Sequence, residues 1–205
     1  MYPRYLHGAN NLRLMASAKS FAHQSYIVFI DEAGFMLDPV VRRTWAPKGQ
    51  TPILRINRPH DRISVIGAIS IRREDQSFRF HYRLSPDNAN FRGPMVVEFV
   101  DEIHHKLHGD MTLIWDEISI HWGTAVKEFL RVNPSIEAVG FPPYAPELNP
   151  VDMVWSYVKY GRLANYCPHD LNELRITLTA EFTRLKGKQK LLRSFLAHTG
   201  LSLDP

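Results

Sequence analysis

Two short apolar segments, each closed by an aspartate, constrain the fold of this chain more than any other feature. They are "YIVFID" (26–31) and "MTLIWD" (111–116). Both are too short for a typical helix and rich in strand-forming residues, so each is predicted to be a strand covered on both faces. If the two strands are parallel neighbours, they lie about 4.8 Å apart. Asp31 and Asp116 would then meet at one edge of a sheet.

The rest of the chain alternates between strand and helix patterns. Three further strands are expected, at 62–71, 77–84 and 136–141, the first two joined as a hairpin by "RREDQ". Helices are expected at about 91–107, 124–132, 149–163 and within 169–198. This order is typical of a mixed five-stranded α/β sheet flanked by helices. Residues 1–25 show no clear helical or strand periodicity in their hydrophobic residues. We interpret them as a tail or linker remnant before one domain at 26–205.

Composition limits the class of protein. A length of 205 residues with 44% hydrophobic content suits one domain with a buried core. The net charge of +4 is compatible with a polyanionic partner such as DNA but does not establish one. The single cysteine excludes an internal disulfide and a cysteine-based zinc cluster, which favours a reducing compartment. No apolar run approaches the roughly 20 residues of a membrane span, so a cytoplasmic protein without a membrane partner is expected.

The stretch "PPYAPELNPVDMVW" (142–155) is predicted to deliver a third acid, Asp152. Asn149 is a favourable N-cap and Pro150 suits the first helical position, which places Asp152 in the first turn of a helix. The preceding prolines restrict the conformations of the approach. An apolar face at helical spacing would hold this helix against the sheet; its members are Val151, Val154, Trp155 and Val158.

Three carboxylates meeting in this way would suit two Mg²⁺ or Mn²⁺ ions and phosphodiester chemistry. Each acid also has an ordinary interpretation, because Asp is common at strand ends and stabilises helix N-termini. Glu32 and Glu117 are alternative ligands, although their side chains should point to the opposite face. His121 either orients a phosphate, or donates a hydrogen bond to a metal-binding acid, or is a structural histidine.

The order of these motifs resembles the catalytic domain of DDE transposases of the mariner superfamily, in particular its bacterial insertion-sequence branch. The similar segments are "FIDEAGF" (29–35), "RRTWAPKGQTP" (42–52), "GAIS" (67–70), "WDEISIH" (115–121) and "PPYAPELNPVDMVWSYVK" (142–159). The resemblance implies an RNase H-like fold, two divalent ions, and cleavage and joining of DNA at transposon ends. By position it implies that Asp31, Asp116 and Asp152 are the catalytic and metal-binding acids.

Contacts with DNA are predicted mainly in the "WAPKGQTP" segment, which resembles a family loop that reaches toward DNA or a partner subunit. Its basic surroundings suit phosphate binding, against the alternative of an ordinary solvated loop. Trp45 is either a packing anchor or a wedge in DNA. The predicted DNA-binding residues are Arg42, Arg43, Trp45, Lys48, Arg55, Arg58, His121 and Lys159.

The chain departs from the family pattern in three ways. Glu117 stands where relatives usually have an amide residue, and Asp152 stands where the insertion-sequence branch often has Glu. Relatives also carry helix-turn-helix modules before the catalytic domain, and 25 residues cannot hold them. Either another polypeptide supplies the recognition of the DNA ends, or the reading frame is a fragment; the expected partner besides DNA is a second copy of the chain or a separate recognition polypeptide. Two alternative functions stay open: a non-catalytic DNA-binding or regulatory remnant, and an RNase H-like nuclease without strand transfer.

Overall fold

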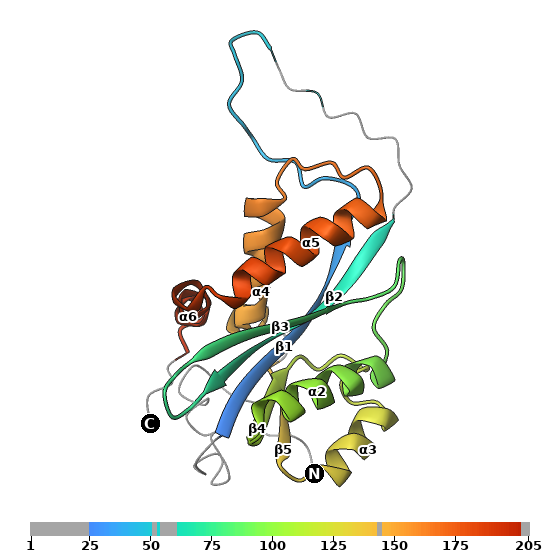
Figure 1. The fold of residues 1–205 in the computed structure, drawn as a ribbon, viewed down its shortest axis with the longest axis vertical. Helices are drawn as coiled ribbons and strands as arrows, with labels where there is room; N and C mark the ends of the chain where they lie inside the picture. Colours follow the sequence, from blue (N-terminus) through green and yellow to red (C-terminus); the bar gives the residue numbers. More distant parts are fainter. Residues whose placement is uncertain (1–24, 51–52, 54–60, 143–144, 202–205) are drawn as a thin grey trace.

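The computed structural model describes residues 25–50, 53, 61–142 and 145–201, and its centre is a five-stranded mixed sheet (Figure 1). The strands lie in the order β3-β2-β1-β4-β5. Strand β1 pairs antiparallel with β2 and parallel with β4; β2 and β3 are antiparallel, and β4 and β5 are parallel. The strands are β1 (Ser25–Met36), β2 (Arg62–Arg72), β3 (Phe78–Leu84), β4 (Asp110–Trp115) and β5 (Ile136–Gly140). The predicted mixed sheet is confirmed, including the parallel contact between the two acid-bearing segments.

Helices cover both faces of the sheet (Figure 1). One face carries α2 (Gly93–Leu107) and α3 (Thr124–Val132). The other carries α4 (Pro150–Ser156), α5 (Leu171–Lys186) and α6 (Gln189–His198). A short 3₁₀ turn, η3 (Pro146–Leu148), precedes α4, and a π-helix, η4 (Tyr157–Arg162), follows it.

The two-sided burial of the central strands explains their apolar sequences. In β1, Phe29 and Phe35 belong to the core under α4, α5 and α6, whereas Val28 and Ile30 belong to the core under α2 and α3. Because successive side chains of a strand point to opposite faces, a strand between two helical layers must be apolar at nearly every position. Asp31 directly follows the buried run of Val28, Phe29 and Ile30 and begins a half-buried part of the strand.

Two predicted element boundaries were wrong. Strand β1 does not end at Asp31 but continues to Met36, because β2 pairs with it as far as the Met36–Arg62 pair. Its pairing with β4 stops at Phe29–Ile114. At Asp31, β1 is therefore paired with β2 but no longer with β4. The helix expected over 149–163 is α-helical only to Ser156, after which it widens into the π-helix, closed by a Leu163 N–H to Val158 carbonyl bond of 2.8 Å.

The segment after β1 leaves the body of the domain as a long extension (Figure 1). Residues 41–50 are exposed, and a turn links the Gln50 N–H to the Pro47 carbonyl at 3.0 Å. Its base is fixed to the chain that follows the π-helix: Val40 forms a β-bridge with Ala164, and the Asn165 side chain bonds the backbone of Arg42 in both directions. The extension therefore starts from a defined point beside η4.

A partly buried histidine in the hairpin predicts how stability depends on pH. His81 lies on β3 with its Nε2 2.8 Å from the Ser70 hydroxyl, and burial, followed by the charges of Lys106 and Lys186, lowers its pKa to about 4. In the unfolded chain the pKa is about 6.5, so between these values the unfolded state binds more protons and stability falls as pH falls. Urea unfolding at pH 7 and pH 4.5 should show this loss, on the order of 2 kcal/mol. The loss of stability between pH 7 and pH 4.5 should be smaller in His81→Gln. An equal loss in this variant would show that His81 does not cause the pH dependence.

Among the described residues, no helix has the length and apolar character needed to cross a bilayer.

Candidate active site

Helix α4 is joined to β1 beside the first acid. The Asn149 side chain caps the helix by accepting the Val151 N–H at 3.1 Å, and it donates to the Ile30 carbonyl at 3.0 Å. Asn149 is buried, and so is the apolar face of Val151, Val154, Trp155 and Val158, as predicted. This one side chain thus starts the helix and sets its position along β1, which brings Asp152 to Asp31.

Asp31 and Asp152 lie close enough for their carboxyl groups to interact, and each shifts the pKa of the other. Burial and then the charge of Asp152 raise the pKa of Asp31 well above its usual value. Burial also raises the pKa of Asp152, opposed by the hydrogen bond with Asp31 and by the charge of Lys159. Two carboxylates this close resist simultaneous ionisation, so the pair tends to retain a proton until a cation replaces it.

Lys159 lies next to this pair. Its ammonium group is 5.1 Å from the centre of the Phe35 ring. Burial lowers the pKa of Lys159, and the charges of Asp31 and Asp152 oppose that effect. The π-helix therefore places a partly buried cation beside the two acids.

The second acid, Asp116, directly follows β4 and is held by His121. Asp116 Oδ1 lies 2.8 Å from His121 Nδ1, and Glu32 Oε1 lies 3.0 Å from His121 Nε2. The His121 ring is fully buried and stacks on Trp115, with centroids 4.6 Å apart and planes 8° apart. Burial disfavours the charged imidazole, but hydrogen bonds to Asp116 and Glu32 outweigh it and raise the pKa of His121 to about 10. A buried imidazolium thus links the two acid-bearing strands.

The three predicted acids therefore come near one another beside the middle of β1 and the carboxyl end of β4. Asp31 and Asp152 interact, and the charge of Asp116 raises the pKa of both. Within residues 25–50, 53, 61–142 and 145–201, no three His, Cys, Asp or Glu side chains already lie in common reach of one metal ion. The donor set still fits Mg²⁺ or Mn²⁺, because it consists of carboxylate oxygens whose mutual repulsion a divalent cation would relieve. Asp116 has a side chain that is 43% exposed and would need to turn from His121 toward the pair.

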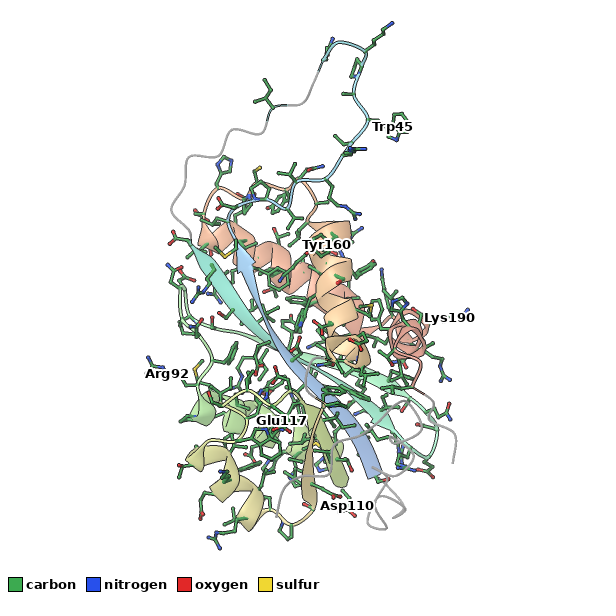
Figure 2. All side chains as sticks on the ribbon, turned by 180° about the vertical axis from the view of Figure 1, so that it is seen from behind. Trp45, Arg92, Asp110, Glu117, Tyr160 and Lys190 are labelled. Carbon is green, nitrogen blue, oxygen red and sulfur yellow. The ribbon has the colours of Figure 1, made fainter. Side chains whose placement is uncertain are left out.

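Glu117 does not join the acids. Its carboxyl group lies across Gly140 at the end of β5, where a Cβ atom on Gly140 would come within 1.6 Å of Glu117 Oε1 (Figure 2 labels Glu117). Glu32 points to His121 and not to the Asp31–Asp152 pair. Neither residue therefore takes the alternative ligand position in this arrangement.

The predicted DNA-binding residues fall into three groups. Arg43, Trp45 and Lys48 lie exposed on the extension, and Trp45 is 100% exposed, so it is not a packing anchor (Figure 2). Arg42 is exposed at its base and bonds the Tyr160 carbonyl at 2.8 Å. Arg55 and Arg58 lie outside the described residues.

The remaining two members of that set are not on the extension. Lys159 lies beside the acids, as described above. His121 has no exposed surface, so the prediction that it contacts a phosphate does not fit its position. The other interpretation, a hydrogen bond to a metal-binding acid, agrees with its contact to Asp116.

Sequence reasoning missed two contacts of the site. Trp155 was expected only as part of the packing face, yet its indole N–H donates to Asp31 Oδ2 at 2.6 Å. Glu32 was considered as a metal ligand and instead holds His121. The amphipathic side chain of Trp155, beside an acid-containing turn, was the available signal for the first contact.

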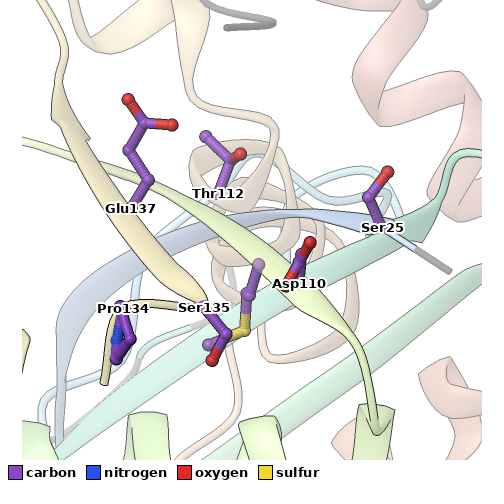
Figure 3. Close-up of a pocket in the computed structure, with 7 residues that line it drawn as sticks. Ser25, Asp110, Thr112, Pro134, Ser135 and Glu137 are labelled. Atoms are coloured by element: carbon purple, nitrogen blue, oxygen red, sulfur yellow. The ribbon is translucent and has the colours of Figure 1, made fainter. Parts of the chain in front are cut away.

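Two cavities flank the sheet at different distances from the acids. One, of about 310 Å³, lies at the start of β1 and β4 and is lined by Ser25, Asp110 and Glu137 among others (Figure 3). It is six residues of β1 away from Asp31. The other, of about 210 Å³, is lined by Phe35, Lys159 and Tyr160 among others; Lys159 links it to the acid pair, but neither acid lines it.

The five-stranded mixed sheet with helices on both faces has the RNase H-like architecture. Residues 26–175 match the family model described as DDE superfamily endonuclease, and the chain belongs to this family. No curated protein matches the chain.

Solved structures of Mos1 transposase share the fold. A Mos1 paired-end complex with the left transposon end is 17% identical with a TM-score of 0.61, over 100% of this chain and 66% of that one. A Mos1 mariner paired end complex with Mn is 17% identical with a TM-score of 0.66, over 94% and 58%. The catalytic domain of Mos1 mariner transposase is 14% identical with a TM-score of 0.53, over 100% of both chains. This chain spans about three fifths to two thirds of the longer Mos1 chains, and the expected RNase H-like architecture is confirmed.

Proposed function

We propose that the protein is the catalytic domain of a transposase that cuts DNA at transposon ends and joins the freed ends to a target. We place it in the bacterial insertion-sequence branch of the mariner superfamily, on the sequence motifs given above. The observation that carries the proposal is the interaction between the carboxyl groups of Asp31 and Asp152, 121 positions apart in the sequence, with the charge of Asp116 acting on both. Membership of the DDE superfamily endonucleases supports it.

The acids and Lys159 have different parts in the proposed reaction. Asp31, Asp116 and Asp152 would together hold two Mg²⁺ or Mn²⁺ ions, with Asp116 turning from His121 toward the other two. Bound there, the two ions would activate a water or a 3′-hydroxyl and stabilise the leaving oxygen. Lys159 would bind a phosphate oxygen next to the acids, because a partly buried ammonium group attracts anions strongly.

The extension is proposed as a DNA contact. Arg43, Trp45 and Lys48 present two charges and an aromatic ring to solvent, which suits a phosphate backbone and an unstacked base. A second copy of the chain, or a separate polypeptide, is proposed as a partner on the DNA.

Plasmid nicking tests the proposed activity. The protein is incubated with supercoiled plasmid and Mn²⁺, in parallel with Asp116→Asn. We expect nicked plasmid from the wild type. In the variant we expect a large loss of nicking, because one carboxylate ligand of the divalent ions is gone and the reaction depends on these ions.

The products distinguish the related functions. Plasmid joined to a labelled DNA end indicates strand transfer, whereas nicked plasmid alone indicates a nuclease. Nicking that persists in Asp116→Asn would come from a contaminant. Absence of nicking and of Mn²⁺ binding in the wild type would favour a non-catalytic remnant.

A further inference from the structure

The Trp155 indole holds one carboxylate oxygen of Asp31. The Nε1 to Oδ2 distance is 2.6 Å, short for a hydrogen bond from nitrogen and typical of a charged acceptor. Trp155 is 4% exposed, so water does not compete for this N–H. The bond joins the helix that carries the third acid to the strand that carries the first.

Two aromatic rings fix the orientation of the Trp155 indole. The rings of Phe35 and Phe182 lie edge to face with it, with centroids 6.1 Å and 5.9 Å away and interplanar angles of 79° in both cases. Close-packed interiors allow few alternative rotamers. The direction of the indole N–H is therefore set by β1 and α5 before any ligand binds.

A glycine on the neighbouring strand makes room for the ring. Gly67 of β2 pairs directly with Asp31 of β1. A Cβ atom at Gly67 would lie 2.5 Å from Trp155 Cη2 and 3.0 Å from Cζ2, closer than real contacts allow. Any larger residue opposite the first acid would thus displace the indole, which explains a glycine in the interior of a buried strand.

We infer that Trp155, seated on Gly67, is a positioning residue that fixes the rotation of the Asp31 carboxylate for cation binding. This inference rests on the proposed function, because it takes Asp31 to be a metal ligand. With Oδ2 held by the indole, rotation about the Cβ–Cγ bond is restricted, and the second oxygen keeps one direction. Outer partners that orient a ligand in this way typically contribute about 10–100-fold to metal affinity.

Substitution of Trp155 by Phe separates positioning from packing. Trp155→Phe keeps an aromatic ring and removes the N–H. Binding of Mn²⁺ alone is measured by the loss of the free-ion electron paramagnetic resonance signal. We expect about 10–100-fold weaker binding in Trp155→Phe and a loss in the same direction in Gly67→Ala.

A second tryptophan provides a matched control. The Trp122 Nε1 is buried and has no hydrogen-bond partner among the described residues. Trp122→Phe removes a buried indole N–H in the same way, away from Asp31. It should bind Mn²⁺ like the wild type, and both Phe variants must show cooperative unfolding for the comparison to count.

Indole NMR signals give a readout independent of activity. The chain has four tryptophans, and the Trp155 signal is the one lost in Trp155→Phe. We expect this signal far downfield because of the short bond, moved upfield in Asp31→Asn, and shifted by Mg²⁺ over the concentration range in which Mg²⁺ displaces Mn²⁺.

Three results would overturn the inference: wild-type Mn²⁺ affinity in Trp155→Phe, a Trp155 signal unaffected by Asp31→Asn, or no Mn²⁺ binding by the wild type. Failure of the proposed transposase function would give a different experimental result from failure of this inference. A protein that binds Mn²⁺ in a Trp155-dependent manner but never nicks plasmid would refute the transposase activity and leave the positioning role intact.

Discussion

Replacing Asp31 by Asn should abolish plasmid nicking and at the same time stabilise the metal-free fold. Losing one charge-stabilising group from an active site typically costs about 10²–10³-fold in rate, and losing a metal ligand should cost at least that. The fold should become more stable because the Asp31 carboxyl is buried next to Asp152 and its pKa is raised by burial and by that neighbour. An Asn side chain can still accept the Trp155 N–H without adding a charge.

The sign of the pH dependence follows from the direction of the shift. An acid whose pKa is higher in the folded than in the unfolded state binds more protons when folded, so its contribution to stability falls as pH rises above its ordinary value near 3.8. The Asp31→Asn variant lacks this contribution. Its advantage over the wild type, measured by urea unfolding without metal, should therefore grow from pH 4 to pH 7.

An acid at the other end of the sheet serves as the control for Asp31. Asp110, labelled in Figure 2, begins β4 and pairs with Ser25, six residues before Asp31 on β1. Asp110→Asn should leave nicking within a few fold of wild type. A metal-free Asp31→Asn protein less stable than the wild type would show that Asp31 and Asp152 do not repel each other. Normal nicking by this variant would show that Asp31 is not catalytic.

The second large effect is expected at His121. Replacing it by Leu leaves the Glu32 carboxylate, which is 16% exposed, without its cationic partner, and frees Asp116 from its contact. Removal of one partner of a buried ion pair typically destabilises by about 3–5 kcal/mol. We expect a loss of that order in urea unfolding, together with a loss of nicking because Asp116 is no longer held beside β1.

A double variant separates the charge from the packing of His121. In Glu32→Gln/His121→Leu the uncompensated charge is gone, so much of the lost stability should return, whereas independent effects would add. His105 is a comparison on α2: it pairs with Asp101 at 3.3 Å but is mostly exposed. His105→Leu should change stability by less than about 0.5 kcal/mol. Equal losses at the two histidines would contradict a special role for His121.

Much of this fold was predictable because its signals are local. The apolar runs around Asp31 and Asp116 predicted central strands, and the Asn149–Pro150 pair predicted where α4 begins. Both predictions depend on neighbours in the sequence: strand burial on two faces requires an unbroken apolar run, and a helix start requires a cap. The end of β1 was wrong because pairing with β2 extends the strand beyond the acid, and that pairing is not local.

The candidate site also has a part that the sequence predicted and a part that only the tertiary structure shows. The residue types and their order alone predicted that Asp31 and Asp116 would be near each other on parallel neighbouring strands, and that a capped helix would bring Asp152 to them. Only the tertiary structure decided how each acid is held: Trp155 lies 124 positions from Asp31, and His121 lies 89 positions from Glu32. A buried N–H or imidazole takes whichever acceptor the packing leaves within reach, and no sequence pattern encodes that choice. The chain thus specifies its acids by local rules, and their hydrogen-bond partners by the packing of distant elements.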